Sequence, residues 1–210
     1  MTLFEAQDLN FVLRDPRTEI LEAWRAQFAE RHAGVAVVEG DPLAADTDAL
    51  VCPGNGFGFM DSGLQLRICE TLGWEVQDRV REAIAADHDE ELFVGQAVMV
   101  ATGKTPTQLI YAPIMRTSFS SESVSVYLAT RATFLTLARH NAAHPSAPIE
   151  SVTVPGLGDE AGALHPAVAA RQIRYAYEEA IGVRKADRRN LSQLLRREKK
   201  LRTVPRSAEE

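Results

Sequence analysis

The chain has 210 residues, of which 45% are hydrophobic and 25% charged, an ordinary composition for a globular protein. This length predicts one domain that buries its core without disulfide or metal staples. The formal charge of −6 is the sum over two regions of opposite charge. Residues 183–210 contain ten Lys/Arg and four Asp/Glu, a net charge of +6, which leaves −12 on residues 1–182. The sequence therefore predicts an acidic body, residues 1–182, and a basic C-terminal tail, residues 183–210, that is helical or disordered.

The cysteines and the apolar runs exclude several classes of protein. Cys52 and Cys69 are the only cysteines, and neither lies in a Cys-x-x-Cys or Cys/His cluster, which argues against a disulfide framework and a zinc site. Residues 1–8 are acidic and lack the apolar segment of a secretory signal. No apolar run approaches the ~20 residues of a membrane-spanning helix. We expect a cytoplasmic protein with no membrane partner, no metal site and no cofactor.

Short apolar runs typical of strands alternate with longer segments of helical periodicity. The expected strands are 11–13, 35–38, 49–52, 97–101, 109–112 and 152–154. The expected helices are 20–28, 64–72, 76–84, 124–138 and 169–180, with a break at Gly73. Asp15 and Pro16 are expected to supply the N-cap and first-turn proline of the first helix. This alternation predicts an α/β layered domain with a mostly parallel or mixed sheet.

Seven of the 13 glycines lie in two short segments, residues 53–63 and 155–162, each directly after an expected strand. Glycine lets backbone N–H groups approach one anion, and the helix that follows adds free N–H groups. Neither segment contains Lys or Arg, a Walker motif or a dinucleotide fingerprint. Because ligands bind beyond the carboxyl ends of parallel strands, the two segments together predict a bound diphosphate. Either segment alone is equally well explained as a tight turn.

The order and spacing of several motifs resemble the macro domain family over about residues 35–180. Gly40-Asp41-Pro42-Leu43 resembles the family's Gly-Asp-Ile-Thr segment, and Asp48-Ala49-Leu50-Val51-Cys52-Pro53-Gly54-Asn55 resembles its Asp-Ala-Ile-Val-Asn-Ala-Ala-Asn strand. Residues 56–64 correspond to the first ligand loop and residues 154–158 to the second. The run Phe57-Gly58-Phe59-Met60-Asp61, together with residues 111–116, is most similar to a bacterial, phage-tail-like branch of the family.

The resemblance implies a three-layer α/β/α fold with a central mixed sheet, and binding of ADP-ribose or of ADP-ribosylated macromolecules. Asp41 would accept a hydrogen bond from the adenine amino group, and Asn55 would lie near the distal ribose. From the residues alone, Asp41 is better explained as a turn residue and Asn55 equally as a left-handed turn residue. The ligand-binding residues that the resemblance implies are Asp41, Pro42, Asn55, Gly56, Phe57, Gly58, Phe59, Met60, Gly63, Pro155, Gly156, Leu157, Gly158 and Asp159.

The sequence leaves open whether such a protein only binds ADP-ribose or also removes it by hydrolysis. Hydrolytic macro domains have an aspartate in a Gly-Gly-Val-Asp segment, and Gln65 occupies that position here, which cannot act as a carboxylate base. Asp61 and Asn55 are the candidate catalytic residues, although we favour Asp61 as a helix cap. Lys104, the body's only lysine, lies in an expected hairpin, so lysine chemistry is not expected.

No aromatic residue follows Tyr177, so the adenine-stacking residue that many macro domains have near the C-terminus is missing. Phe11 or a loop phenylalanine is the candidate replacement. Phe57 and Phe59 either close over the distal ribose or pack on the body. The five histidines are expected at the surface or at helix ends.

The alternative function is a non-catalytic nucleic-acid or protein interaction module that keeps the fold and uses the basic tail. Clustered basic charge is typical of nucleic-acid binding. Four leucines lie among the basic residues and suit a short amphipathic helix: Leu191, Leu194, Leu195 and Leu201. We favour a tail that is solvated or docked on the acidic body over one that binds nucleic acid.

Overall fold

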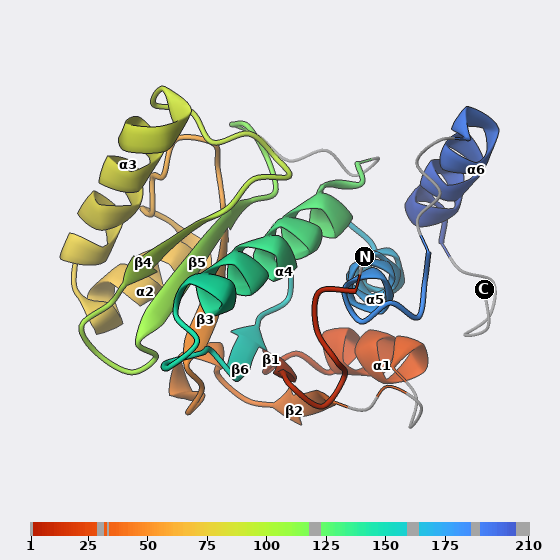
Figure 1. The fold of residues 1–210 in the computed structure, drawn as a ribbon, viewed down its shortest axis with the longest axis horizontal. Helices are drawn as coiled ribbons and strands as arrows, with labels where there is room; N and C mark the ends of the chain where they lie inside the picture. Colours follow the sequence, from red (N-terminus) through yellow and green to blue (C-terminus); the bar gives the residue numbers. More distant parts are fainter. Residues whose placement is uncertain are drawn as a thin grey trace.

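The computed structural model describes residues 2–28, 32, 34–117, 123–158, 164–185 and 190–204, and these form a sheet between two layers of helices (Figure 1). The strands are β1 (Asn10–Asp15), β2 (Val35–Glu39), β3 (Ala49–Gly54), β4 (Val98–Ala101), β5 (Gln108–Pro113) and β6 (Ser151–Val154). The helices are α1 (Thr18–Gln27), the 3-10 turn η1 (Pro42–Ala44), α2 (Gly63–Leu72), α3 (Glu75–His88), α4 (Ser125–Ala143), α5 (Pro166–Ala180) and α6 (Leu191–Arg202).

The strand order is β2-β1-β6-β3-β5-β4, and only the β4–β5 pair is antiparallel. Helices supply the long crossovers that parallel neighbours need. The three-layer α/β/α fold with a mixed sheet is therefore confirmed. The parallel strands end at one edge of the sheet, which we call the carboxyl edge. Among the described residues, no helix has both the length and the apolar character to span a membrane.

The sheet separates two hydrophobic cores. Successive side chains of β3 point alternately into one core and the other. Ala49 and Val51 contribute to the core beneath α1, α4 and α5. Leu50 and Cys52 contribute to the core beneath α2 and α3. A strand covered by helices on both faces is apolar at every position, as in residues 49–52.

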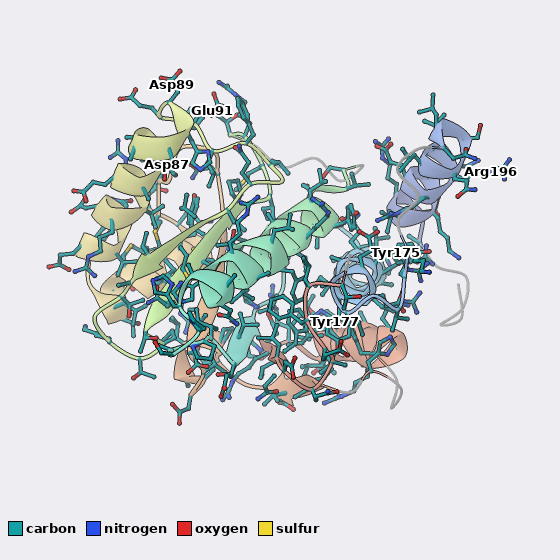
Figure 2. The ribbon with its side chains drawn as sticks, in the orientation of Figure 1. Asp87, Asp89, Glu91, Tyr175, Tyr177 and Arg196 are labelled. Carbon is teal, nitrogen blue, oxygen red and sulfur yellow. The ribbon has the colours of Figure 1, made fainter. Side chains whose placement is uncertain are left out.

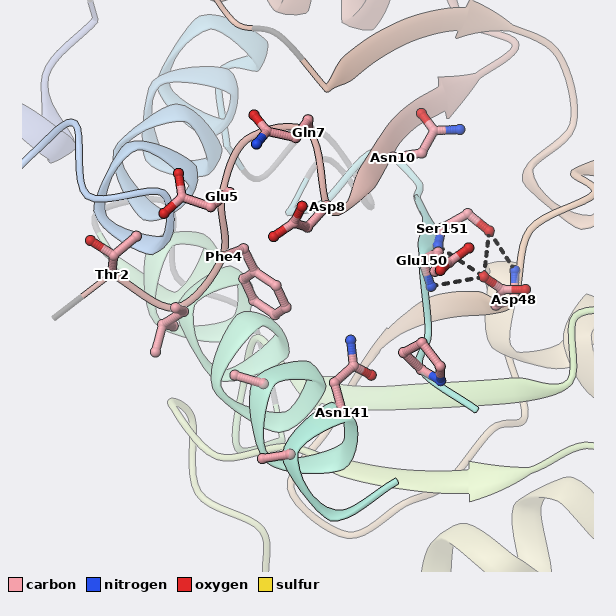
Figure 3. A pocket seen from close by; sticks show the side chains of 14 residues that line it. Thr2, Phe4, Glu5, Gln7, Asp8, Asn10, Asp48, Asn141, Glu150 and Ser151 are labelled. Carbon is pink, nitrogen blue, oxygen red and sulfur yellow. Dashed lines mark hydrogen bonds between the residues drawn. The ribbon is translucent and has the colours of Figure 1, made fainter. Parts of the chain in front are cut away.

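Asp48 ties the beginnings of β3 and β6 together (Figure 3). Its Oδ2 accepts hydrogen bonds from Glu150 N at 3.0 Å, Ser151 N at 2.9 Å and Ser151 Oγ at 2.8 Å. In return, Asp48 N donates to Ser151 Oγ at 2.9 Å. A broad hollow of about 1080 Å³ lies at this edge, lined in part by Asp48 and Ser151. It is therefore at the opposite edge of the sheet from the two glycine segments.

The start of α1 differs from the sequence prediction. Asp15 is the last residue of β1 and is buried, while Arg17 is the N-cap residue of α1 and makes no side-chain capping hydrogen bond. The prediction that Asp15 caps the helix and that Pro16 lies in its first turn is wrong by two residues. The Asp15 carboxylate is used at the carboxyl edge instead. The break at Gly73 is confirmed, because this residue ends α2 with a φ of 105°.

Helix α6 of the basic tail packs on α5. Leu201 is buried between them. The buried Arg171 of α5 donates from Nη1 to Lys200 O at 2.7 Å and to Thr203 O at 3.0 Å. Arg197 also forms an ion pair with Glu179 of α5. The sequence left open whether the tail docks on the acidic body, and α6 does so.

Glu178 is a buried carboxylate of α5 that joins several segments. It accepts a hydrogen bond from Arg184 Nε at 2.7 Å and lies 3.3 Å from His32 Nε2 and 3.7 Å from Arg174 Nε. Burial alone would raise the pKa of Glu178, but the hydrogen bond and charge of Arg184, the His32 hydrogen bond and the Arg174 charge outweigh it and lower that pKa. The surface expectation is wrong for His32, which is buried here.

Replacing Glu178 with Gln is expected to lower the free energy of unfolding by about 1–3 kcal/mol near neutral pH. Because the pKa of Glu178 is lowered on folding, its ionised form stabilises the protein above the unfolded-state pKa of about 4.3. This contribution is lost as the pH falls through the folded-state value, so wild type and variant should converge in acid. Urea unfolding at a series of pH values measures this, with the exposed Glu22→Gln as control. A difference that does not change with pH would contradict it.

Candidate functional site

Three segments meet at the carboxyl edge. Asp41 follows β2, the first loop (residues 55–62) follows β3, and the second loop (residues 155–158) follows β6. Because β3 and β6 are neighbours, the two loops lie side by side, although about 100 residues separate them in sequence. Strand β1 separates β6 from β2. At ~4.8 Å between neighbouring strands, β2 and β3 are roughly 14 Å apart.

The Asn55 side chain closes the first loop on itself. Its Oδ1 accepts hydrogen bonds from Phe57 N at 2.9 Å and Phe59 N at 3.3 Å, and its Nδ2 donates to Phe59 O at 2.8 Å. Asn55 does not have a positive φ, so its interpretation as a left-handed turn residue is wrong. It shapes the turn through its side chain. The second hydrogen of Nδ2 is not used by these bonds and is the one that a ribose hydroxyl could accept.

Tyr111 of β5 supports the first loop. Its buried hydroxyl donates to Asn55 O at 2.8 Å. A Cβ atom on Gly54 would overlap that hydroxyl, so glycine is required there by the tyrosine. This glycine therefore has a packing role that the sequence alone could not separate from a ligand-binding role.

The open backbone donors near the first loop lie at the start of α2. Gly56 N donates to Arg116 O at 2.9 Å, and Met60 N donates to Gln77 Oε1 at 2.8 Å, so these groups are already used. The N-cap residue of α2, Ser62, makes no side-chain capping hydrogen bond. An uncapped helix N-terminus presents free N–H groups and the positive end of the helix dipole to an anion.

Gln65 and Asp61 have different environments. Gln65 is buried, and its Nε2 donates to Pro53 O at 2.7 Å, so it supports the end of β3. Asp61 is exposed and, among the described residues, makes no hydrogen bond or ion pair. Our preference for Asp61 as a helix cap is not supported, because Ser62 occupies the N-cap position. Asp61 is thus an available carboxylate at the rim of the first loop.

The second loop is held by Asp15, a contact that sequence reasoning missed. Asp15 Oδ2 accepts a hydrogen bond from Gly156 N at 3.1 Å and one from Arg17 Nη2 at 2.7 Å. Asp15 Oδ1 accepts from Arg17 Nε at 2.7 Å. Arg17 is half exposed, so a cation stands beside a loop that has none of its own. Asp15 and Arg17 directly follow the expected strand 11–13, so the rule that ligands bind beyond the carboxyl ends of strands would have identified both as candidates.

Asp41 has the turn role expected from the residues alone. Its Oδ1 accepts a hydrogen bond from Leu43 N at 3.0 Å and caps η1. Its Oδ2 pairs with Arg67 of α2 at 2.5 Å, and both side chains are more than a third exposed. Each carboxylate oxygen can accept more than one hydrogen bond, so Asp41 can also serve a ligand.

The remaining site candidates differ in how much of them a ligand can reach. Pro42, Met60, Pro155 and Leu157 are buried, so a ligand at this edge meets their backbone. Gly58 and Gly158 have φ of 74° and 79°, and Gly63 opens α2 with a φ of 54°, all in the left-handed region that favours glycine. Asp159 lies outside the described residues.

The aromatic candidates are also separated by burial. Phe11 is fully buried against Phe134 and Tyr177, which excludes it as an adenine-stacking residue. Phe59 is 46% exposed, with the Arg81 guanidinium 4.8 Å from its ring centroid. Phe57 is partly exposed and has the Arg116 guanidinium 5.1 Å from its ring centroid. Arg116 in turn pairs with Glu91 at 2.6 Å.

This architecture is similar to that of several solved structures. No family model and no curated protein matches the sequence. Among solved structures, the macrodomain of Mycobacterium tuberculosis DarG is similar with a TM-score of 0.54 at 24% identity, over 68% of this chain and 88% of that chain. The macrodomain of Thermus aquaticus DarG gives a TM-score of 0.55 at 19% identity, over 80% and 91%. The chain has the macrodomain fold.

A third similar structure is Thermosipho africanus DarTG in complex with ADP-ribose, with a TM-score of 0.50 at 19% identity. That match covers 68% of this chain and 38% of that chain. The resemblance drawn from the motifs is confirmed at the level of the fold.

Replacing Asp15 with Asn is expected to lower the free energy of unfolding by on the order of 1–3 kcal/mol. The substitution keeps the shape of the side chain but removes the charge that holds Arg17 and Gly156. Urea unfolding measures the change. The matched control is Asp46→Asn at an exposed position, which should leave stability unchanged. Equal stability of the two variants would refute the anchoring role of Asp15.

Proposed function

We propose that this macrodomain binds ADP-ribose, free or attached to a macromolecule, at the carboxyl edge. The observation that carries the proposal is the adjacency of the two glycine loops on β3 and β6, with Asp41 two strands beyond β6. The similar Thermosipho DarTG structure contains ADP-ribose, which supports the same ligand class. Along the edge, Asp41 comes first, then Arg17, then the second loop and then the first loop.

This order matches the order of groups in ADP-ribose. Asp41 would accept a hydrogen bond from the adenine amino group, since a carboxylate favours an NH₂ donor over a carbonyl. Its pairing with Arg67 holds the carboxylate in one orientation. The diphosphate would lie near the second loop, and the distal ribose would lie at the first loop.

The diphosphate would be held largely by backbone donors. Gly156 N is bonded to Asp15, so Leu157 N, Gly158 N and the start of α2 are the donors that we assign to it. Arg17 would add a cation from the β1–α1 connection. These local donors are needed because residues 1–182 carry a net charge of −12, which disfavours a dianion at long range.

Titration calorimetry with ADP-ribose tests this proposal. Asp41→Ala is expected to weaken binding about tenfold or more, because a hydrogen bond to a charged group contributes about 1.5–3 kcal/mol. Gly156→Glu is expected to abolish detectable binding, because it adds a carboxylate beside the phosphate donors. Asp87→Ala, an exposed position on α3, is the control and should bind like the wild type. Absence of heat with a folded wild type would refute the proposed function.

A second candidate function is removal of ADP-ribose by hydrolysis. The observation that favours it is the exposed, available Asp61 carboxylate at the rim of the first loop. Asp61 would orient a water molecule and accept its proton as the water oxygen attacks the distal ribose, while the bond from that ribose to the modified macromolecule breaks and the macromolecule leaves with a proton. Gln65 cannot do so, because it is an amide and its Nε2 is bonded to Pro53 O. Lys104 lies at the opposite edge, before β5, where its Nζ donates to Thr71 O.

Asp61→Asn is expected to slow release of ADP-ribose from a mono-ADP-ribosylated protein by about 100-fold or more, the usual size of a general-base contribution. The variant should still bind ADP-ribose, because the amide keeps the size of the side chain. Chromatographic measurement of released ADP-ribose checks the rate, with Asp87→Asn as control. Wild-type release by Asp61→Asn would exclude Asp61 as the base. No release by the wild type would leave binding as the function.

A further inference from the structure

A hollow of about 260 Å³ lies between α5 and α6 and is lined mainly by cationic side chains. Five of its lining residues are Arg184, Lys185, Arg196, Arg197 and Lys200, and none of the described residues that line it is acidic. Figure 2 shows Tyr175 of α5, which also lines the hollow, and Arg196 on α6. The hollow thus concentrates positive charge on an otherwise acidic protein.

Two of the five cations are neutralised and held in place. Arg184 pairs with Glu178, and its guanidinium lies 3.8 Å from the centroid of the Tyr175 ring. Arg197 pairs with Glu179, and its guanidinium lies 4.8 Å from the centroid of the Tyr127 ring. These contacts fix the wall of the hollow.

The other three cations are Lys185, Arg196 and Lys200, and within the described ranges none of them forms an ion pair. Like charges gathered around one hollow repel one another, and an anion relieves that repulsion. Arginine and lysine together provide the fork-shaped and point-charge donors that phosphate oxygens accept.

The positive surface extends beyond the hollow. Arg184 and Lys185 also line an adjoining hollow that includes Arg131 of α4, together with Glu179, the carboxylate that pairs with Arg197. Cations therefore continue from α6 past the end of α5 to α4, a path longer than one phosphate group. Figure 2 shows the acidic residues Asp87, Asp89 and Glu91 at the other end of the molecule, beside α3. A polyanion would be attracted to one end of the protein and repelled by the other.

We propose that the hollow between α5 and α6 binds the phosphate groups of a nucleic-acid strand. Lys185, Arg196 and Lys200 contact the phosphodiester oxygens, and Arg184 and Arg197 form the rigid wall. The site is separate from the carboxyl edge, because Tyr175 lies nine residues along α5 from Pro166, roughly 14 Å of helix from the end that follows the second loop. Neither site depends on occupancy of the other.

The test is fluorescence anisotropy of a labelled single-stranded oligonucleotide over a series of salt concentrations. The hollow variant is Lys185→Gln, Arg196→Gln and Lys200→Gln combined in the full chain. On a single strand each phosphate contact adds about 0.7 unit to the slope of log affinity against log salt, so the variant should lose about two units. Its affinity at low salt should fall roughly tenfold or more.

The matched control replaces three exposed cations outside the hollow, Arg25, Lys104 and Arg139, with Gln. It has the same net charge as the hollow variant and should keep the wild-type salt slope. Both variants should keep the wild-type unfolding midpoint and ADP-ribose titration, which separates this site from the proposed function. Equal binding by wild type and hollow variant, equal loss in the control, or no binding at low salt would each overturn the proposal.

Two competitors identify the source of the anionic groups. Unlabelled oligonucleotide should displace the probe, while tripolyphosphate and poly-glutamate at the same concentration of charged groups should not. Displacement by tripolyphosphate would mean a small-anion site, and displacement by poly-glutamate a site for any acidic polymer. Either result would overturn the assignment to a nucleic-acid strand.

Discussion

Strand β6 pairs with β1 on one side and with β3 on the other, and the candidate site exists only because of this pairing. The pairing places the second loop beside the first and puts Gly156 within reach of Asp15. Hydrogen bonds at the far edge, from Ser151 and Glu150 to Asp48, maintain the same register. A shift of β6 by one residue would turn Val152 and Val154 out of the core and misplace the second loop.

The composition of the body limits how such a site can work. Neither glycine loop of this acidic body contains a cation, so the proposed function assigns the diphosphate to backbone donors and to Arg17. Yet backbone N–H groups at a tight loop are also needed for the loop itself, and Asn55, Gln77 and Arg116 O accept several of them. The donors that stay available are those that folding leaves open, above all at the uncapped start of α2.

The sequence predicted the elements well because periodicity and burial are local signals. The run 49–52 is apolar at every position since helices cover both faces of β3, and Gly73 ends α2. Side-chain partners were harder to predict. Asp15 looked like a helix cap, but its partner Gly156 lies 141 residues away. His32 looked like a surface residue, but it meets Glu178 across 146 residues. Local pattern does not encode such distant contacts.

The same limit applies to the charge of the tail. The net charge of +6 does not show which cations of the tail pair with carboxylates in the folded protein and which do not. Arg197 pairs with Glu179 of α5 and, with Leu201, docks α6 on the body, while Glu178 pairs with Arg184 in the segment that follows α5. Docking brings Lys185, Arg196 and Lys200 together around one hollow, with no carboxylate among the described residues that line it. A flexible tail would spread these charges through solvent, but a docked helix concentrates them at a defined place. The charge asymmetry of the sequence thus becomes a binding surface only through the packing of α6.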